Sequence, residues 1–342
     1  MNEPRNFKMG NMAVLSAMLV VFIHVSGPKI VGGVDWWFHY IIRSVFASIA
    51  VPYFFVAAGF FLSKHICENG WYARELKKRC KTLLVPYLIW CVLWAGYNYM
   101  LGLIGDCVKG VEFDFSILPF LNWSTFGIDL FQAPSCFPLW FVRSLLILFT
   151  VSPILVWLVR KCGIVYLFLL FVANLTWLYF KAKLPSSWQN FGYYGLSLEG
   201  FMYFTFGLWL RDGIRLPQWG GMGCATIGFV IGLFSGVLVV KGLVPQVLPC
   251  ITLIGTVFTL VGVYSVMPDR KMPRVIYSLT FPIYIVHLFP ILFIAIVFPS
   301  DARTIARMCF DYLFALATSV FVIMAVRRLI PRFNQAAFGG RG

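Results

Sequence analysis

Ten apolar runs, each close to the length of a helix that crosses a lipid bilayer, constrain this chain more than any other feature. Such a helix needs about 20 mostly apolar residues. The runs are continuously apolar and do not alternate, which favours helices over barrel strands. The sequence therefore predicts an all-α fold, a polytopic transmembrane helical bundle. The runs cover residues 8–27, 44–63, 83–104, 138–158, 164–180, 197–210, 222–240, 246–266, 277–298 and 304–326.

The composition agrees with a position in the membrane. Only 12% of the 342 residues are charged and 60% are apolar, whereas a soluble globular protein carries roughly 25% charged residues. These values exclude a water-soluble enzyme, a disordered regulator and a small disulfide scaffold. The formal net charge of +15 is better explained by basic residues at a membrane surface than by nucleic-acid binding. We expect membrane lipid as a partner, and no nucleic acid.

The basic residues also predict the orientation. Cytoplasmic loops carry an excess of Lys and Arg, and most of the 28 basic residues lie inside if the N-terminus is cytoplasmic. Ten spans then place both termini in the cytoplasm. Residues 1–342 form a single transmembrane domain with an outer loop at 105–137. Cys107 and Cys136 share this loop and form a disulfide or remain two unrelated thiols, and the nine cysteines include no CxxC pair, so we expect no metal site.

Four ionisable side chains lie at a similar predicted depth in the outer half of the bundle. They are His24, Arg143 and Glu199, which lie in three different runs, and Arg43, which directly precedes a fourth. A charged side chain in mid-bilayer costs roughly 2.5–3.5 kcal/mol even on the lenient insertion scale. One shared polar cavity would explain four such groups, although a lone membrane histidine can simply bond to a neighbouring helix. For His287, in the ninth run, that simpler interpretation is favoured.

A basic segment, residues 74–81, leads directly into the third run, and it contains Lys78, Arg79 and Lys81. Basic residues at a cytoplasmic helix end are what orientation and anionic lipid require. From composition alone, this interpretation is favoured. The alternative is a docking surface for a polyphosphate ligand that approaches from the cytoplasm and accepts charge-assisted hydrogen bonds.

Five segments carry a resemblance to a known family. They are Phe22-Ile23-His24-Val25-Ser26, Arg43 followed by Val51-Pro52-Tyr53-Phe54-Phe55, the basic run 78–81 followed by Pro86-Tyr87, Leu139-Trp140-Phe141-Val142-Arg143, and Ile283-Tyr284-Ile285-Val286-His287. In this order, and over nearly the whole chain, they resemble the acyltransferase 3 family of integral-membrane acyltransferases. Two positions depart from the pattern: Ala58, where the family often has Ser, and Thr82, at a position that is frequently basic.

The resemblance implies transfer of an acyl group, commonly acetyl from acetyl-CoA, to a hydroxyl of a carbohydrate, a glycolipid or another envelope molecule. It also implies that Lys78, Arg79 and Lys81 face the phosphates of the acyl-CoA donor. We accordingly expect an integral protein of the bacterial inner (cell) membrane that uses acyl-CoA as donor substrate and no metal.

Within that activity, each residue of the predicted cavity has an expected role. His24 would deprotonate the acceptor hydroxyl or take the acyl group itself. Arg43 and Arg143 would stabilise the oxyanion that develops on the thioester carbonyl, and Glu199 would orient the histidine or bind sugar hydroxyls. The rival class is a transporter or flippase for an envelope glycan precursor, because intramembrane His, Arg and Glu residues are common there too.

Overall fold

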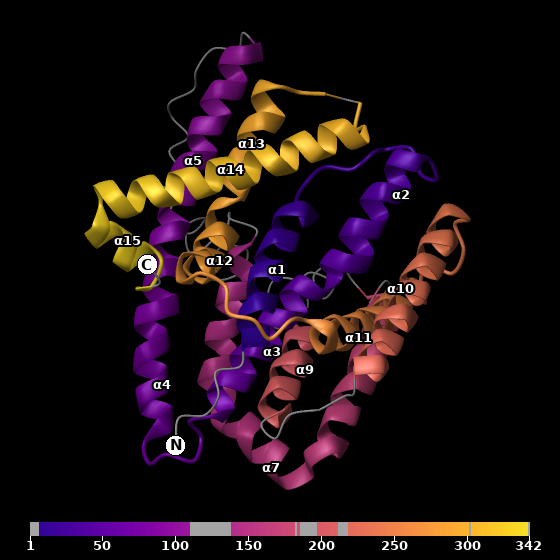
Figure 1. Cartoon of the computed structure of the whole chain (residues 1–342), viewed down its shortest axis with the longest axis vertical. Coiled ribbons are helices and arrows are strands. Elements are labelled where there is room, and N and C mark those ends of the chain that lie inside the picture. Colours follow the sequence, from indigo (N-terminus) through magenta and orange to yellow (C-terminus); the bar gives the residue numbers. More distant parts are fainter. Residues whose placement is uncertain are drawn as a thin grey trace.

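The computed structural model describes residues 7–109, 138–181, 183–184, 197–210, 218–300 and 302–340. Within these ranges the regular elements are all helices, as the apolar runs predict (Figure 1). Most of the predicted outer loop, including Cys136, lies outside the described residues, so the pairing of Cys107 with Cys136 stays a prediction.

The N-terminal half contains α1 (Phe7–Ile23), α2 (Val34–Tyr40), the π-helix η1 (Ile41–Phe46), the 3₁₀ turn η2 (Ala47–Ile49), α3 (Ala50–Ser63), α4 (Trp71–Arg79), the π-helix η3 (Cys80–Leu84), α5 (Val85–Lys109) and α7 (Leu139–Lys181). The C-terminal half contains α9 (Leu198–Trp209), α10 (Gln218–Val240), α11 (Leu248–Val266), α12 (Arg274–Val286), α13 (Leu288–Val297), α14 (Ile305–Leu329) and α15 (Pro331–Ala337).

Helix length and apolarity give six candidate membrane spans among the described residues, or seven if α12 and α13, which are bent by 47°, form one span. All ten predicted runs overlap helices, but α1 has only 17 residues and α9 only 12. The runs 138–158 and 164–180 both lie in α7, which has 43 residues. The count of ten spans and the cytoplasmic position of both termini therefore stay predictions.

The long element α7 is folded back at Gly163, and its two legs meet at the bottom of Figure 1. Gly163 has φ 50° and ψ −127°, a conformation that glycine adopts far more readily than residues with a Cβ. The first leg carries Trp140 and Arg143, and the second carries Trp177 and Lys181. The turn at Gly163 therefore brings residues from two predicted runs into neighbouring helical legs.

Two glycines let α3 and α9 approach at backbone distance. A Cβ on Gly59 would lie 2.0 Å from the carbonyl oxygen of Phe204, and a Cβ on Gly207 would lie 2.1 Å from that of Val56. Small residues permit such close packing of membrane helices. The contact fixes the first turn of α9, which contains Glu199, in its place relative to α3.

Side-chain hydrogen bonds tie α1 to the start of α12. Nδ2 of Asn11 donates to the carbonyl oxygens of Pro268 at 2.7 Å and Arg270 at 2.9 Å. The hydroxyl of Tyr277 donates to Oδ1 of Asn11 at 2.8 Å. These bonds join the first turns of both helices, and the two helices pack along each other. Because α1 and α12 run in the same direction, their C-terminal ends also meet.

Candidate functional site

Two histidines meet where α1 and α12 end. His24 follows the last residue of α1, and His287 stands at the break between α12 and α13. Nε2 of His287 lies 3.1 Å from Nδ1 of His24, and the two ring centroids are 4.9 Å apart. His287 is fully buried, whereas His24 is half-buried. The structure thus joins the histidine that the sequence favoured for catalysis to the one that it did not.

The hydrogen bonds of the pair determine which nitrogen atoms carry protons. Nδ1 of His287 lies 3.1 Å from the carbonyl oxygen of Ile283, which can only accept, so this nitrogen donates and Nε2 carries the lone pair. That lone pair accepts from Nδ1–H of His24, which also lies 3.0 Å from the carbonyl oxygen of Val20. In the neutral pair, Nε2 of His24 is therefore the basic nitrogen.

Proline explains the break at His287. Pro290 lacks the N–H that would bond the carbonyl of Val286, and its ring crowds that carbonyl. The helix axis bends by 47° at this point. On α13, the carbonyl oxygen of Phe289 accepts a hydrogen bond from the hydroxyl of Tyr97, which belongs to α5. A hydrogen bond from α5 therefore holds the chain two residues after the buried histidine.

Arg43 lies within electrostatic range of His24 and of His39. It belongs to the π-helix η1, and such segments are frequent at functional sites. Nε2 of His39 bonds the carbonyl oxygen of Val25 at 3.0 Å and so holds the chain directly after His24. His39 carries no signal in the sequence, because it precedes the second apolar run, where a histidine has no burial cost.

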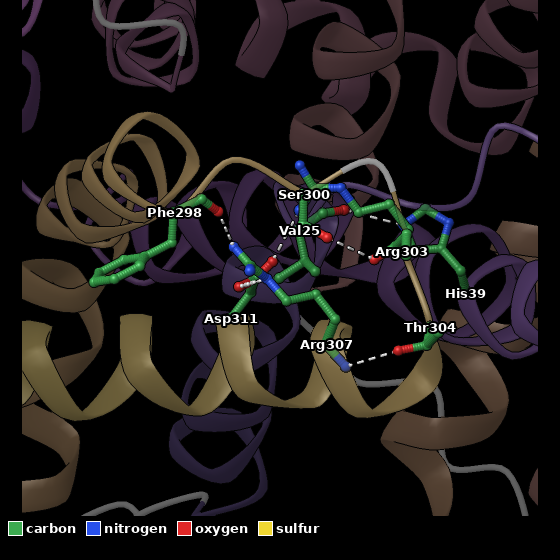
Figure 2. A network of polar contacts seen from close by, with 9 residues as sticks. Val25, His39, Phe298, Ser300, Arg303, Thr304, Arg307 and Asp311 are labelled. Atoms are coloured by element: carbon green, nitrogen blue, oxygen red, sulfur yellow. Dashed lines mark hydrogen bonds and ion pairs between the residues drawn. The ribbon is translucent and has the colours of Figure 1, made fainter. Parts of the chain in front are cut away.

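A polar network holds the first turns of α14 beside this region (Figure 2). The Asp311 carboxylate, which is 4% exposed, accepts from Nε of Arg307 at 2.7 Å and from Nη1 of Arg303 at 3.2 Å. Figure 2 draws this network together with Val25 and His39, and α1 packs against α14, where the ring centroid of Tyr312 lies 5.7 Å from that of Phe22. The network therefore supports the end of α1 from the side of α14.

Arg143 lies on the first leg of α7 and faces α5. It is 7% exposed and lies within electrostatic range of Tyr87 and Cys91, both buried on α5. Arg143 is thus enclosed in the bundle, as expected of a functional arginine in a membrane protein. Its place in the same cavity as His24 stays a prediction.

Glu199, in the first turn of α9, lines a cavity of about 710 Å³. The described residues that line this cavity do not include His24, Arg43 or Arg143. Of the four residues predicted to share one cavity, the structure brings His24 and Arg43 within electrostatic range of each other. The gathering of all four around one cavity stays a prediction.

A row of aromatic rings links the lining of this cavity to the histidine pair. Phe55 lines the cavity, and its ring centroid is 4.7 Å from that of Phe141. The ring of Phe141 is 5.5 Å from that of Tyr284, which in turn is 6.4 Å from that of His287. A continuous series of ring contacts therefore connects the lining of the cavity to His287.

The three residues predicted to face CoA phosphates differ in their surroundings. Arg79 forms an ion pair with Glu75 at 3.0 Å, and its guanidinium lies 4.3 Å from the ring centroid of Phe149. Lys78 also pairs with Glu75, at 3.1 Å, but its side chain is 52% exposed. Lys81 is exposed on the π-helix η3. The ammonium groups of Lys78 and Lys81 are thus accessible, whereas Arg79 is held between α4 and α7.

Among the residues that the structure describes, no three His, Cys, Asp or Glu side chains gather as metal ligands. The accessible cationic groups of the basic segment suit a phosphorylated ligand.

Comparison with known proteins agrees with the resemblance. The profile of a family described as an acyltransferase domain matches residues 12–328. The succinoglycan biosynthesis protein ExoH of Rhizobium meliloti (strain 1021) is 27% identical over 164 residues, which are 44% of this chain and 42% of that protein. The chain thus aligns with less than half the length of this relative. No solved structure matches.

Proposed function

The chain belongs to the acyltransferase 3 family of integral-membrane acyltransferases, and from this premise we propose that it moves an acyl group, expected to be acetyl, from acyl-CoA to a hydroxyl of a carbohydrate or glycolipid. The observation that carries the proposal is the contact between His24 and His287, because it makes Nε2 the basic nitrogen of His24, a side chain that lies within electrostatic range of Arg43. The relative ExoH, which takes part in succinoglycan biosynthesis, supports a polysaccharide acceptor.

In the proposed reaction, Nε2 of His24 takes the proton of the acceptor hydroxyl. The hydroxyl oxygen then bonds to the thioester carbonyl carbon, and the bond to the CoA sulfur breaks. The proton passes from His24 to the leaving thiolate, which gives CoA thiol and the ester. General-base action of this kind contributes typically 10²–10⁴-fold. Passage of the acyl group through Nε2 of His24 uses the same nitrogen as nucleophile.

His287 and Arg43 assist this chemistry in different ways. As His24 takes a proton it becomes a cation, and its Nδ1–H then donates a charge-assisted hydrogen bond to Nε2 of His287. The buried partner therefore orients the base and stabilises its charged form. The guanidinium of Arg43 stabilises negative charge that develops on the thioester carbonyl oxygen.

The donor would approach from the cytoplasmic side of the inner membrane. The phosphates of CoA accept charge-assisted hydrogen bonds from Lys78 and Lys81, which are exposed. Arg79 has a positioning role in this proposal, because its bond to Glu75 and its contact with Phe149 fix α4 against α7.

The test is a transfer assay with radiolabelled acetyl-CoA and membranes that contain the full chain. The change His24→Ala should abolish labelling of the glycan fraction, whereas the control His65→Ala should not, since His65 lies in the exposed loop after α3. Acetyl-CoA should also raise the melting temperature of the wild-type protein, because a ligand that binds the native state stabilises it. Full labelling by the His24 variant, or no stabilisation by acetyl-CoA, would contradict the proposal and favour a transporter.

A further inference from the structure

The cavity of about 710 Å³ lined by Glu199 is built from several parts of the chain. Its volume lies within the range of ligand sites, roughly 300–1,000 Å³. Both legs of α7 contribute to the lining, together with η2, α3, α9 and the start of α11. Its polar lining residues include Ser48, Lys181, Ser197, Glu199, Tyr203 and Gln246.

Tyr203 indicates that this cavity receives a polar ligand. The side chain is 3% exposed, and within the described part of the chain its hydroxyl has no hydrogen-bond partner. A buried polar group without a partner is costly and rare in native proteins. Tyr203 follows Glu199 by one helical turn, and both residues line the same cavity. A ligand with hydroxyl groups would satisfy both.

Two tryptophans give the cavity a second chemical character. Trp140 comes from the first leg of α7 and Trp177 from the second, and both line the cavity. Indole rings present large, rigid apolar faces. A sugar ring has apolar C–H faces and a rim of hydroxyl groups, so it matches a site that combines indole faces with a carboxylate, a phenol and an amide.

Other ligand classes fit this lining less well. A polyphosphate needs surplus positive charge, but Lys181 lies within electrostatic range of Glu199, which balances it. A lipid chain needs an apolar lining, which a different cavity provides. That cavity, of about 370 Å³, lies between α5, α13 and α14 and is lined almost entirely by apolar side chains that include Trp90, Phe289 and Phe293.

We propose that the Glu199 cavity is a recognition subsite for neutral sugar units of the acceptor, next to the unit that is acylated. This inference rests on the proposed function. The described residues that line the cavity do not include His24 or His287, so its residues bind the acceptor and do not touch the reacting atoms. Carboxylate and phenol hold sugar hydroxyls, and the indole faces hold the rings.

The test measures binding without any acyl donor. The probe is the unmodified repeat-unit oligosaccharide, prepared from the surface polysaccharide of cells that lack the gene, and it is titrated calorimetrically into the full chain in lipid nanodiscs. A hydrogen bond to a charged group contributes enough to change a dissociation constant about 10- to 100-fold. We therefore expect Glu199→Gln to weaken binding by about that factor, and Trp177→Ala also to weaken it.

Matched variants separate recognition from folding. The change Tyr203→Phe should weaken binding severalfold without lowering the melting temperature, because the hydroxyl has no partner within the described part of the chain. The control Trp157→Ala should bind as the wild type does, because Trp157 is 56% exposed on α7 and does not line the cavity.

The outcomes distinguish the subsite from the proposed function. No binding by the wild type, or unchanged binding by the Glu199, Trp177 and Tyr203 variants, would overturn the subsite. If these variants lose binding but no acetyl group is transferred by the wild type, the proposed function fails and the subsite stands. In an active enzyme, the same variants should raise the KM for the glycan and leave the KM for acyl-CoA unchanged.

Discussion

Replacing His287 with leucine removes the acceptor that its Nε2 offers to His24 at 3.1 Å. The loss matters most when His24 is protonated, because its Nδ1–H then belongs to a cation. A hydrogen bond to a charged group contributes about 1.5–3 kcal/mol. Since about 1.4 kcal/mol corresponds to a tenfold change in rate, kcat should fall about 10- to 150-fold. In our proposal neither CoA nor the glycan is bound by His287, so the KM values for both substrates should change little.

The assay follows transfer from radiolabelled acetyl-CoA at saturating donor and acceptor. The variant His287→Gln serves as the conservative comparison, because its side-chain carbonyl oxygen can still accept from Nδ1–H of His24. It should recover much of the rate lost in His287→Leu. The control His65→Leu should transfer at the wild-type rate, since that side chain is exposed and pairs with Glu68.

Two results would refute this reasoning. A wild-type rate in His287→Leu, with His24→Ala inactive, would show that the base works without its buried partner. Equal losses in the leucine and glutamine variants, together with a lower melting temperature in both, would show that His287 acts only through packing.

Three further predictions concern stability and donor binding. The change Gly207→Ala should reduce the free energy of unfolding by about 1–3 kcal/mol, seen as a lower melting temperature, because a Cβ would lie 2.1 Å from a backbone oxygen. The control is Gly223→Ala, where no atom lies within 4 Å of the added Cβ. The change Asp311→Asn should reduce the free energy of unfolding by about 3 kcal/mol, since two arginines share this carboxylate. The control Glu68→Gln, at an exposed ion pair, should leave the melting temperature unchanged. The change Lys81→Ala should raise the KM for acetyl-CoA severalfold in steady-state kinetics with little effect on the melting temperature, because Lys81 is exposed.

Apolar patterning predicted the helices well, because a long apolar run has few alternatives to a helix in lipid. Patterning could not predict how runs join. The runs on either side of Gly163 form two helical legs, as predicted, but the turn that folds one leg back on the other depends on the backbone torsion of that glycine, φ 50°. The close approach of α3 and α9 through Gly59 and Gly207 is also a tertiary property.

The candidate site was predictable only at residues whose ionisable side chains are costly to place in a membrane. His24 stood out because ionisable groups are rare in apolar runs, and Arg43 because it lies at the start of one; the structure places the two within electrostatic range. The role of His287 was not predictable, because its partner is 263 residues away in the sequence. Tyr203 gave no signal at all, since a tyrosine in an apolar run is ordinary and only the structure shows its hydroxyl without a partner among the described residues.

The helix α5 has a mechanical consequence. It continues from the basic segment through η3, and the stretch from Trp71 to Tyr97 is long enough to cross the membrane. At the end of this stretch, the hydroxyl of Tyr97 donates a hydrogen bond to the carbonyl oxygen of Phe289, next to the kink that carries His287. One continuous stretch of helix thus joins the basic segment to the kink that carries His287, so a tilt of this stretch would also displace the buried partner of His24.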